Sequence, residues 1–188
     1  MFTIMAPSKQ DQDIEIHITR KFRDINVSLA KLRKLIKAVC KRFESSENTN
    51  METPSNRYEI SVAVVDDNEF QKINYEFLNR KSISDCLSFD LSDSGEPDSR
   101  KTFELVINGQ MALRQAALRG HSEEAELALY VTHALLHNFG FDDREPGIAG
   151  SMHEKEDEIL HELGYGPVYN KLMSSIENKK TKKGKYKK

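Results

Sequence analysis

The sequence predicts an α+β fold in which one strongly apolar helix lies at the centre of a single domain. Three observations predict it. Four short segments have strand character, several longer ones repeat apolar residues at helical spacing, and one of these helices has almost no polar surface. At 188 residues, the chain is long enough to bury one core but not two.

The four predicted strands differ in how clearly their pattern shows. The first alternates Ile14, Ile16 and Ile18 with polar residues, as a half-buried strand does. The last two flank a turn-rich segment, residues 92–100, so we expect a hairpin with a long exposed loop. The predicted strands are residues 13–19, 58–65, 85–91 and 102–108.

The predicted helices are recognised by their caps and by apolar spacing. Ser28, Asp66, Ser122 and Ser151 can each cap a helix start, because their side-chain oxygens can accept a hydrogen bond from a free backbone N–H. Glu69 and Glu154 add capping-box partners three residues later. Two predicted helices have both ends defined, residues 28–43 and residues 110–119, the second of which ends at Gly120. Two others are defined by their starts, at Asp66 and at Ser122. A fifth begins at Ser151 and ends before Gly164, and a last short helix precedes the tail.

The helix that begins at Ser122 is the most apolar of the set. Its sequence leaves little polar surface between Leu127 and Leu136, so we expect it to be central and buried. Cys40 and Cys86 have apolar neighbours and are expected to be buried free thiols.

Charge is distributed unevenly along the chain. The formal net charge is −2, but the last ten residues hold seven lysines and no acid, so residues 1–178 carry −9. We predict one domain over residues 1–178 and a basic disordered tail over 179–188 that either adds phosphate affinity or only aids solubility. The chain has no apolar run of membrane-spanning length and no signal-peptide start, so we expect a cytoplasmic protein without membrane partners.

Two histidines on the central helix are candidate metal ligands. His133 and His137 are four residues apart, so their imidazoles project from one face, one turn apart. Gly140 can take the left-handed conformation and turn the chain back, which brings Asp143 to the pair as a third ligand. Two imidazoles and one carboxylate suit zinc with an open fourth position, the arrangement of catalytic sites. The alternative is a hydrogen-bonded pair of core histidines.

Other patterns narrow the chemistry. The motif is H-A-L-L-H and lacks the glutamate of H-E-x-x-H, so a metalloprotease is disfavoured. Three further histidines are expected to be exposed at helix ends or on the surface: His121, His153 and His161. The alternative for His153 is a place near the metal site, if the loop folds back.

The run from His133 to Asp143, H-A-L-L-H-N-F-G-F-D-D, resembles the signature of the YbeY endoribonucleases, H-G-x-L-H-L-x-G-Y-D-H. The segment D-C-L-S-F at residues 85–89 is similar to the family's T-D-V-L-S-F strand. Met152, Glu156 and the residues up to Gly164 are similar to its closing helix. The order and spacing agree from Tyr58 to Tyr165.

The resemblance implies a small four-stranded mixed sheet with the metal helix packed on it. It also implies a single-strand-specific, metal-dependent endoribonuclease that acts in ribosomal RNA maturation, near the 3′ end of the small-subunit RNA, and in ribosome quality control. The expected partners are therefore single-stranded or ribosomal RNA and the small ribosomal subunit. Attack by activated water and attack by the RNA 2′-hydroxyl both remain open as the reaction route.

The resemblance also implies roles for individual residues. His133 and His137 are metal ligands, and Asp143 stands where the family usually has a third histidine. This exchange lowers the charge of the site by one unit; zinc is the first choice, with manganese or iron as alternatives. The family's RNA-engaging arginine falls on Leu78, so Arg80 is the nearest candidate for that catalytic role.

The strand F-E-L-V-I at residues 103–107 keeps the family's acid as Glu104, a second candidate catalytic residue that could orient water. The alternative is that Glu104 is a strand residue that faces solvent. Two rival functions stay open: an RNA- or ribosome-associated protein with a structural metal and little or no nuclease activity, and a zinc or iron hydrolase of small substrates.

Overall fold

The computed structural model describes residues 14–44, 57–93, 100–143, 146–166 and 168–169. The order of its elements is β1 (Ile14–Arg20), α1 (Leu29–Glu44), β2 (Tyr58–Val65), α2 (Asp67–Leu78), β3 (Cys86–Asp90), β4 (Lys101–Asn108), α3 (Gly109–Arg119), α4 (Glu123–Asn138) and α5 (Pro146–Glu162). The predicted tail and the predicted last short helix lie outside the described residues.

The four strands form one mixed sheet in the order β1-β2-β4-β3. β1 and β4 each pair in parallel with β2, whereas β3 pairs antiparallel with β4 from Cys86 opposite Ile107 to Asp90 opposite Phe103. The predicted α+β class, the four-stranded mixed sheet and the pairing of the third strand with the fourth are therefore confirmed.

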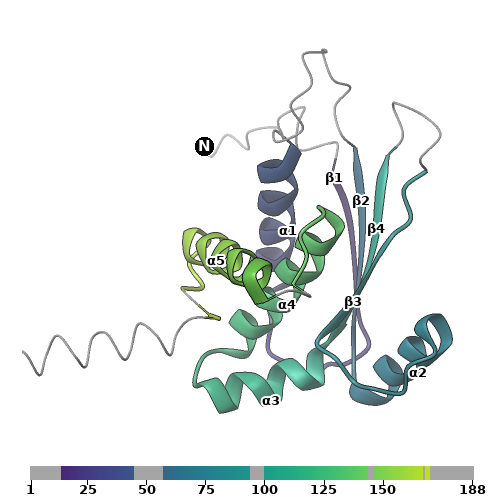
Figure 1. The fold of residues 1–188 in the computed structure, drawn as a ribbon. Coiled ribbons are helices and arrows are strands. Elements are labelled where there is room, and N and C mark those ends of the chain that lie inside the picture. Colours follow the sequence, from purple (N-terminus) through teal and green to yellow (C-terminus); the bar gives the residue numbers. More distant parts are fainter. Residues whose placement is uncertain (1–13, 45–56, 94–99, 144–145, 167, 170–188) are drawn as a thin grey trace, which may run out of the picture.

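The sheet is covered mainly on one face. Figure 1 shows α1, α3, α4 and α5 on one side of the strands, with α2 beside their opposite side. β4 turns Phe103, Leu105 and Ile107 toward the helical layer, where they are buried, while Glu104 is exposed. This alternation follows from the period of two along a strand.

Helix α4 is the central helix, as predicted. Every residue from Ala125 to Leu136 is buried except His133. The side chain of Ser122 caps its first turn by accepting from the backbone N–H of Ala125 at 3.2 Å. The helix therefore brings its apolar length into the core and leaves one imidazole facing a different environment.

The start of α5 differs from the prediction. The helix begins at Pro146, so Ser151 lies inside it and is not its cap. Proline is favourable at the first helical position, because its fixed φ is helical and its missing N–H would have no partner there. The capping-box pattern of Ser151 and Glu154 was thus a coincidence of spacing.

The two cysteines lie in different environments. Cys40 is buried in the core, as predicted, whereas Cys86 is only half-buried. No helix within the described residues is long and apolar enough to cross a membrane.

Candidate metal centre

The two predicted histidine ligands point their Nε2 atoms at each other. The distance from His137 Nε2 to His133 Nε2 is 3.0 Å, and the ring planes are at 89°. Both side chains come from the last two turns of α4, at the four-residue spacing that places them on one face. The helix alone therefore sets this half of the centre.

The third predicted ligand reaches the pair through the turn after α4. Gly140 has a φ of +86°, the left-handed conformation expected of it. Asp143 then places Oδ2 at 3.5 Å from His133 Nε2 and Oδ1 at 3.7 Å from His137 Nε2. The structure thus brings His133, His137 and Asp143 together as one group of potential ligands.

Hydrogen bonds on the far side of each imidazole determine which nitrogen carries the proton. His133 Nδ1 lies 2.6 Å from Glu156 Oε1, and His137 Nδ1 lies 3.1 Å from the carbonyl oxygen of Phe141. Both oxygens are acceptors, so each Nδ1 donates and each neutral ring keeps its lone pair on Nε2. Two unprotonated Nε2 atoms 3.0 Å apart repel each other unless they share a proton or bind one metal cation.

The spacing of the three ligand atoms fits a small divalent metal. Zinc bonds of about 2.0 to 2.1 Å in a tetrahedron place neighbouring ligand atoms about 3.3 Å apart. The observed distances of 3.0, 3.5 and 3.7 Å bracket that value. Small adjustments of the side chains suffice for all three atoms to bind one ion, and a fourth position remains for water or substrate.

The electrostatic surroundings of His133 favour a cation. Burial of the ring acts to lower its pKa, but the hydrogen bond to Glu156 and the negative charges of Glu156, Asp85 and Asp143 outweigh it and raise the pKa above its usual value. The same negative field that favours a proton on His133 favours a divalent metal, which would displace that proton.

Glu156 is a residue of the centre whose role was not predicted from the sequence. Its side chain is fully buried, and its second oxygen lies 2.9 Å from His153 Nδ1, so one carboxylate connects two histidines. The His153 ring stacks on Tyr169, with centroids 3.5 Å apart. A glutamate on the apolar side of α5, between Met152 and Ile159, was the available signal, since a buried charge needs a partner.

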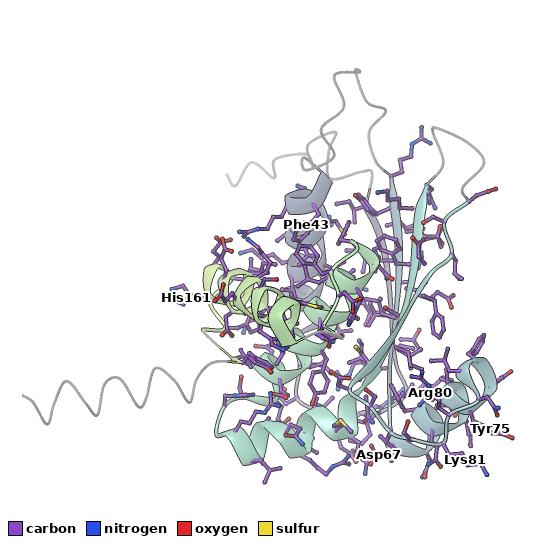
Figure 2. The ribbon with its side chains drawn as sticks, viewed as in Figure 1. Phe43, Asp67, Tyr75, Arg80, Lys81 and His161 are labelled. Carbon is purple, nitrogen blue, oxygen red and sulfur yellow. The ribbon has the colours of Figure 1, made fainter. Side chains whose placement is uncertain are left out.

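The other histidines had mixed outcomes. His153 lies at the cavity wall, which is the alternative that the sequence left open, whereas the predicted exposure of His121 is wrong, because its side chain is almost completely covered and contacts the buried carboxylate of Glu126. The ring of His153 is covered by Glu156 and Tyr169, and the ring of His121 is covered by Glu126 in the first turns of α4. Only His161 is exposed as predicted, and Figure 2 shows it on the outer side of α5.

Aromatic packing holds the ligand-bearing turn on the core. Phe139 stacks on Phe43 of α1 at 5.1 Å and meets Phe103 and Tyr58 edge-on at 5.6 and 6.0 Å. Phe141 meets Phe43 at 5.3 Å. Since these rings flank Gly140, they fix the direction in which the chain leaves α4 and so position Asp143.

The three ligands lie at the wall of an open cavity of about 830 Å³. Arg80, which follows α2, and Arg119, at the end of α3, line the same cavity, as does Tyr130. Figure 2 shows Arg80 between α2 and the sheet. Arg119 Nη1 is 3.2 Å from the buried carboxylate of Glu126, so it is the guanidinium of Arg80, together with the potential metal centre, that gives the cavity the chemistry to hold a phosphate group.

Asp85 and Cys86 form a second group of possible ligands with His133. Burial and the negative charges of Asp85, Glu156 and Asp143 raise the pKa of the Cys86 thiol well above its usual value. The thiol therefore stays protonated at neutral pH unless a metal binds it.

Glu104 is not brought to the centre. It is exposed on β4, on the face of the sheet opposite the side chains that pack under the helices, and it does not line the cavity. The alternation of side chains along the strand places it there, and the sheet itself separates it from the histidines. The structure thus places Glu104 as a strand residue that faces solvent.

Comparison with known proteins identifies the family of this chain. The family model described as Endoribonuclease YbeY matches residues 17–164. A protein named Endoribonuclease YbeY from Lysinibacillus sphaericus is 32% identical to this chain, over 79% of this chain and 98% of its own length. Another protein of that name, from Macrococcus caseolyticus, is 37% identical over 56% of this chain and 72% of its own length.

A solution structure of a Thermotoga maritima protein aligns over 80% of this chain and 88% of its own, with 20% identity and a TM-score of 0.48. With the family model spanning most of the chain and a relative at 32% identity matched over nearly its whole length, this chain belongs to the YbeY endoribonuclease family.

Proposed function

We propose that this chain is a metal-dependent endoribonuclease that cuts single-stranded RNA. One observation carries the proposal: two imidazole nitrogens and a carboxylate, 3.0 to 3.7 Å apart, converge at the wall of an 830 Å³ cavity that an arginine also lines. Membership of the YbeY family supports the endonuclease class.

Each residue has a defined part in this proposal. A divalent ion held by His133, His137 and Asp143 supplies Lewis acidity toward a phosphoryl oxygen or water. Arg80 binds a phosphate oxygen of the RNA, a task for which its planar fork of N–H donors is suited. Glu156 orients His133 and keeps its Nε2 available, so it is a positioning residue and not a catalytic one.

The substrate we propose is ribosomal RNA, processed near the 3′ end of the small-subunit RNA, together with defective ribosomes in quality control. Zinc is the first choice of metal, because two imidazoles and a carboxylate with one open position match its catalytic sites; manganese and iron are the alternatives. We place this activity in the cytoplasm, at the small ribosomal subunit.

The test combines metal analysis with RNA cleavage. We expect the purified protein to contain about one equivalent of metal, to cut a single-stranded RNA oligomer, and to lose this activity with a chelator. His137→Ala should lose both metal and cleavage. His161→Ala is the matched control, because this histidine is exposed and lies away from the cavity.

The products identify the reaction route. A 2′,3′-cyclic phosphate would indicate attack by the RNA 2′-hydroxyl, whereas a simple phosphate end would indicate attack by water. RNA that stays intact while the protein holds its metal would refute the nuclease proposal.

A second candidate is an RNA- or ribosome-binding protein whose metal is structural. The observation that favours it is Leu78, which is exposed at the position of the family's arginine. If Arg80 takes over that role, Arg80→Gln should reduce cleavage, while Leu78→Arg should leave cleavage unchanged or increase it. If the second candidate is correct, the wild-type chain binds RNA without cutting it, and neither substitution changes the products.

A further inference from the structure

Helix α1 carries a concentrated positive charge on its outer side. Four basic residues at helical spacing line an open groove of about 480 Å³ together with Ala30 and Ala38. We call this set the α1 basic face: Arg33, Lys34, Lys37 and Lys41. Arg33, Lys34 and Lys41 are exposed, and Lys37 is partly so.

This concentration is unusual in a chain body that is acidic. Residues 1–178 carry a net charge of −9. Some other surface lysines of the described residues lie beside carboxylates: Lys21 Nζ is 2.7 Å from Glu69 Oε1, and Lys155 Nζ is 2.7 Å from Glu158 Oε2. In the same described part of the chain, no carboxylate forms an ion pair with Arg33, Lys34 or Lys37.

The geometry of the face suits a linear polyanion. Arg33, Lys37 and Lys41 recur every four residues, which is about 6 Å along a helix axis per step. The small side chains of Ala30 and Ala38 allow a backbone to approach closely between the basic rows. A row of like charges at regular spacing matches a chain of phosphates better than it matches a single small anion.

The contacts between α1 and α4 show which end of the α1 basic face lies on the side of the metal centre. The backbone N–H groups of Asn26 and Ser28, just before α1, donate to Glu123 and Glu124 in the first turn of α4. At the other end, Phe43 packs on Phe139, which follows α4. The two helices therefore run in the same direction, as Figure 1 shows for their shared layer, and the Lys41 end lies on the side of the ligand-bearing turn.

We propose that the α1 basic face is a docking surface for the sugar-phosphate backbone of RNA, outside the catalytic cavity. It binds RNA by charge and not by sequence. Because it lies outside the catalytic cavity, it raises the affinity for long RNA more than the affinity for short RNA. The choice of RNA as the polyanion rests on the proposed function. The charge and shape of the face are observed independently of it.

The test compares two triple substitutions in the full-length protein. The first is Arg33→Gln with Lys34→Gln and Lys37→Gln. The control removes the same charge elsewhere: Lys21→Gln, Lys72→Gln and Lys155→Gln, at lysines that lie beside carboxylates. Binding of a labelled single-stranded RNA of about 30 nucleotides is measured with chelator present, over a range of salt concentrations.

Each single-strand phosphate contact contributes about 0.7 to the slope of log affinity against log salt concentration. We expect the first variant to lose about 2 from this slope and the control to lose much less. A third variant that exchanges Arg33→Lys, Lys34→Arg and Lys37→Arg keeps the charge and should keep the slope. Circular dichroism checks that all variants are folded.

The outcomes separate this proposal from the nuclease proposal. Cleavage of a short oligomer, with metal, should be unchanged by the first variant and lost in His137→Ala. If the chain does not cut RNA but the first variant still flattens the slope, the docking surface stands alone. If the first variant and the control give the same slope, the docking proposal is wrong, and the face serves another partner such as an acidic protein.

Discussion

Replacing Glu156 by glutamine tests the internal design of the metal centre. The substitution keeps the size of the side chain but removes its charge, and the carboxylate that held both His133 and His153 becomes an amide. A glutamine can present its oxygen to only one of the two rings, and its NH₂ group then faces the other. We expect the zinc affinity to fall while the protein remains folded.

The size of the loss follows from the contact with His133. This bond is 2.6 Å long and fully shielded from water, since Glu156 is completely buried. A hydrogen bond to a charged group contributes about 1.5 to 3 kcal/mol, which corresponds to roughly 10- to 150-fold in a dissociation constant. Loss of a residue that orients a metal ligand typically costs about 10- to 100-fold in metal affinity. The two estimates agree.

Competition against a chromophoric chelator measures this affinity, with Glu154→Gln as the control because Glu154 is exposed on the same helix. Protons compete with the metal for wild-type His133 as the pH falls through its raised pKa. The advantage of the wild type should therefore be largest above that range and smaller below it. A zinc dissociation constant unchanged by Glu156→Gln at pH 8 would refute this account of the centre.

Three further substitutions test the turn after α4, the third ligand of the centre, and an ion pair between α2 and α3. Phe139→Ala removes a partly buried ring from the aromatic cluster and should lower the free energy of unfolding by about 2 to 3 kcal/mol in denaturant titration; an unchanged midpoint would contradict the anchoring role. Asp143→His introduces the third imidazole that the resemblance implies and should shift metal preference from manganese toward zinc in competition experiments, whereas an unchanged ratio would mean that the third ligand does not set selectivity. Asp67 accepts two hydrogen bonds from Arg114, and these lower the pKa of its carboxyl group although burial acts to raise it. The charged pair therefore contributes about 1 kcal/mol to the free energy of unfolding. This contribution is present above the unfolded-state pKa of the carboxyl group and is lost as the pH falls through the folded-state pKa. Asp67→Asn should accordingly lower the melting temperature at pH 7 but not at pH 2, and an equal decrease at both pH values would rule out the charged pair as the cause.

The elements whose pattern repeats locally were predictable. The period of two in β1 and the apolar length of α4 follow from residues close in sequence, and both were predicted correctly. The start of α5 was not, because Pro146 and Ser151 are both acceptable starts and the local pattern does not choose between them. The pairing of β3 with β4 was predictable from the hairpin pattern, whereas the places of β1 and β2 in the sheet came only from the structure, because no short-range pattern states which strands pair when they are far apart in the sequence.

The candidate site divides in the same way. By itself, the sequence determined that His133 and His137 share a helix face, and that Gly140 can turn the chain so that Asp143 follows, because helix geometry and the freedom of glycine are local properties. Only the tertiary structure decided that Glu156 would hold His133, that Arg80 would line the cavity and that Glu104 would face away. These outcomes depend on which face of each strand and helix meets which neighbour, and that is decided by the packing of the whole core.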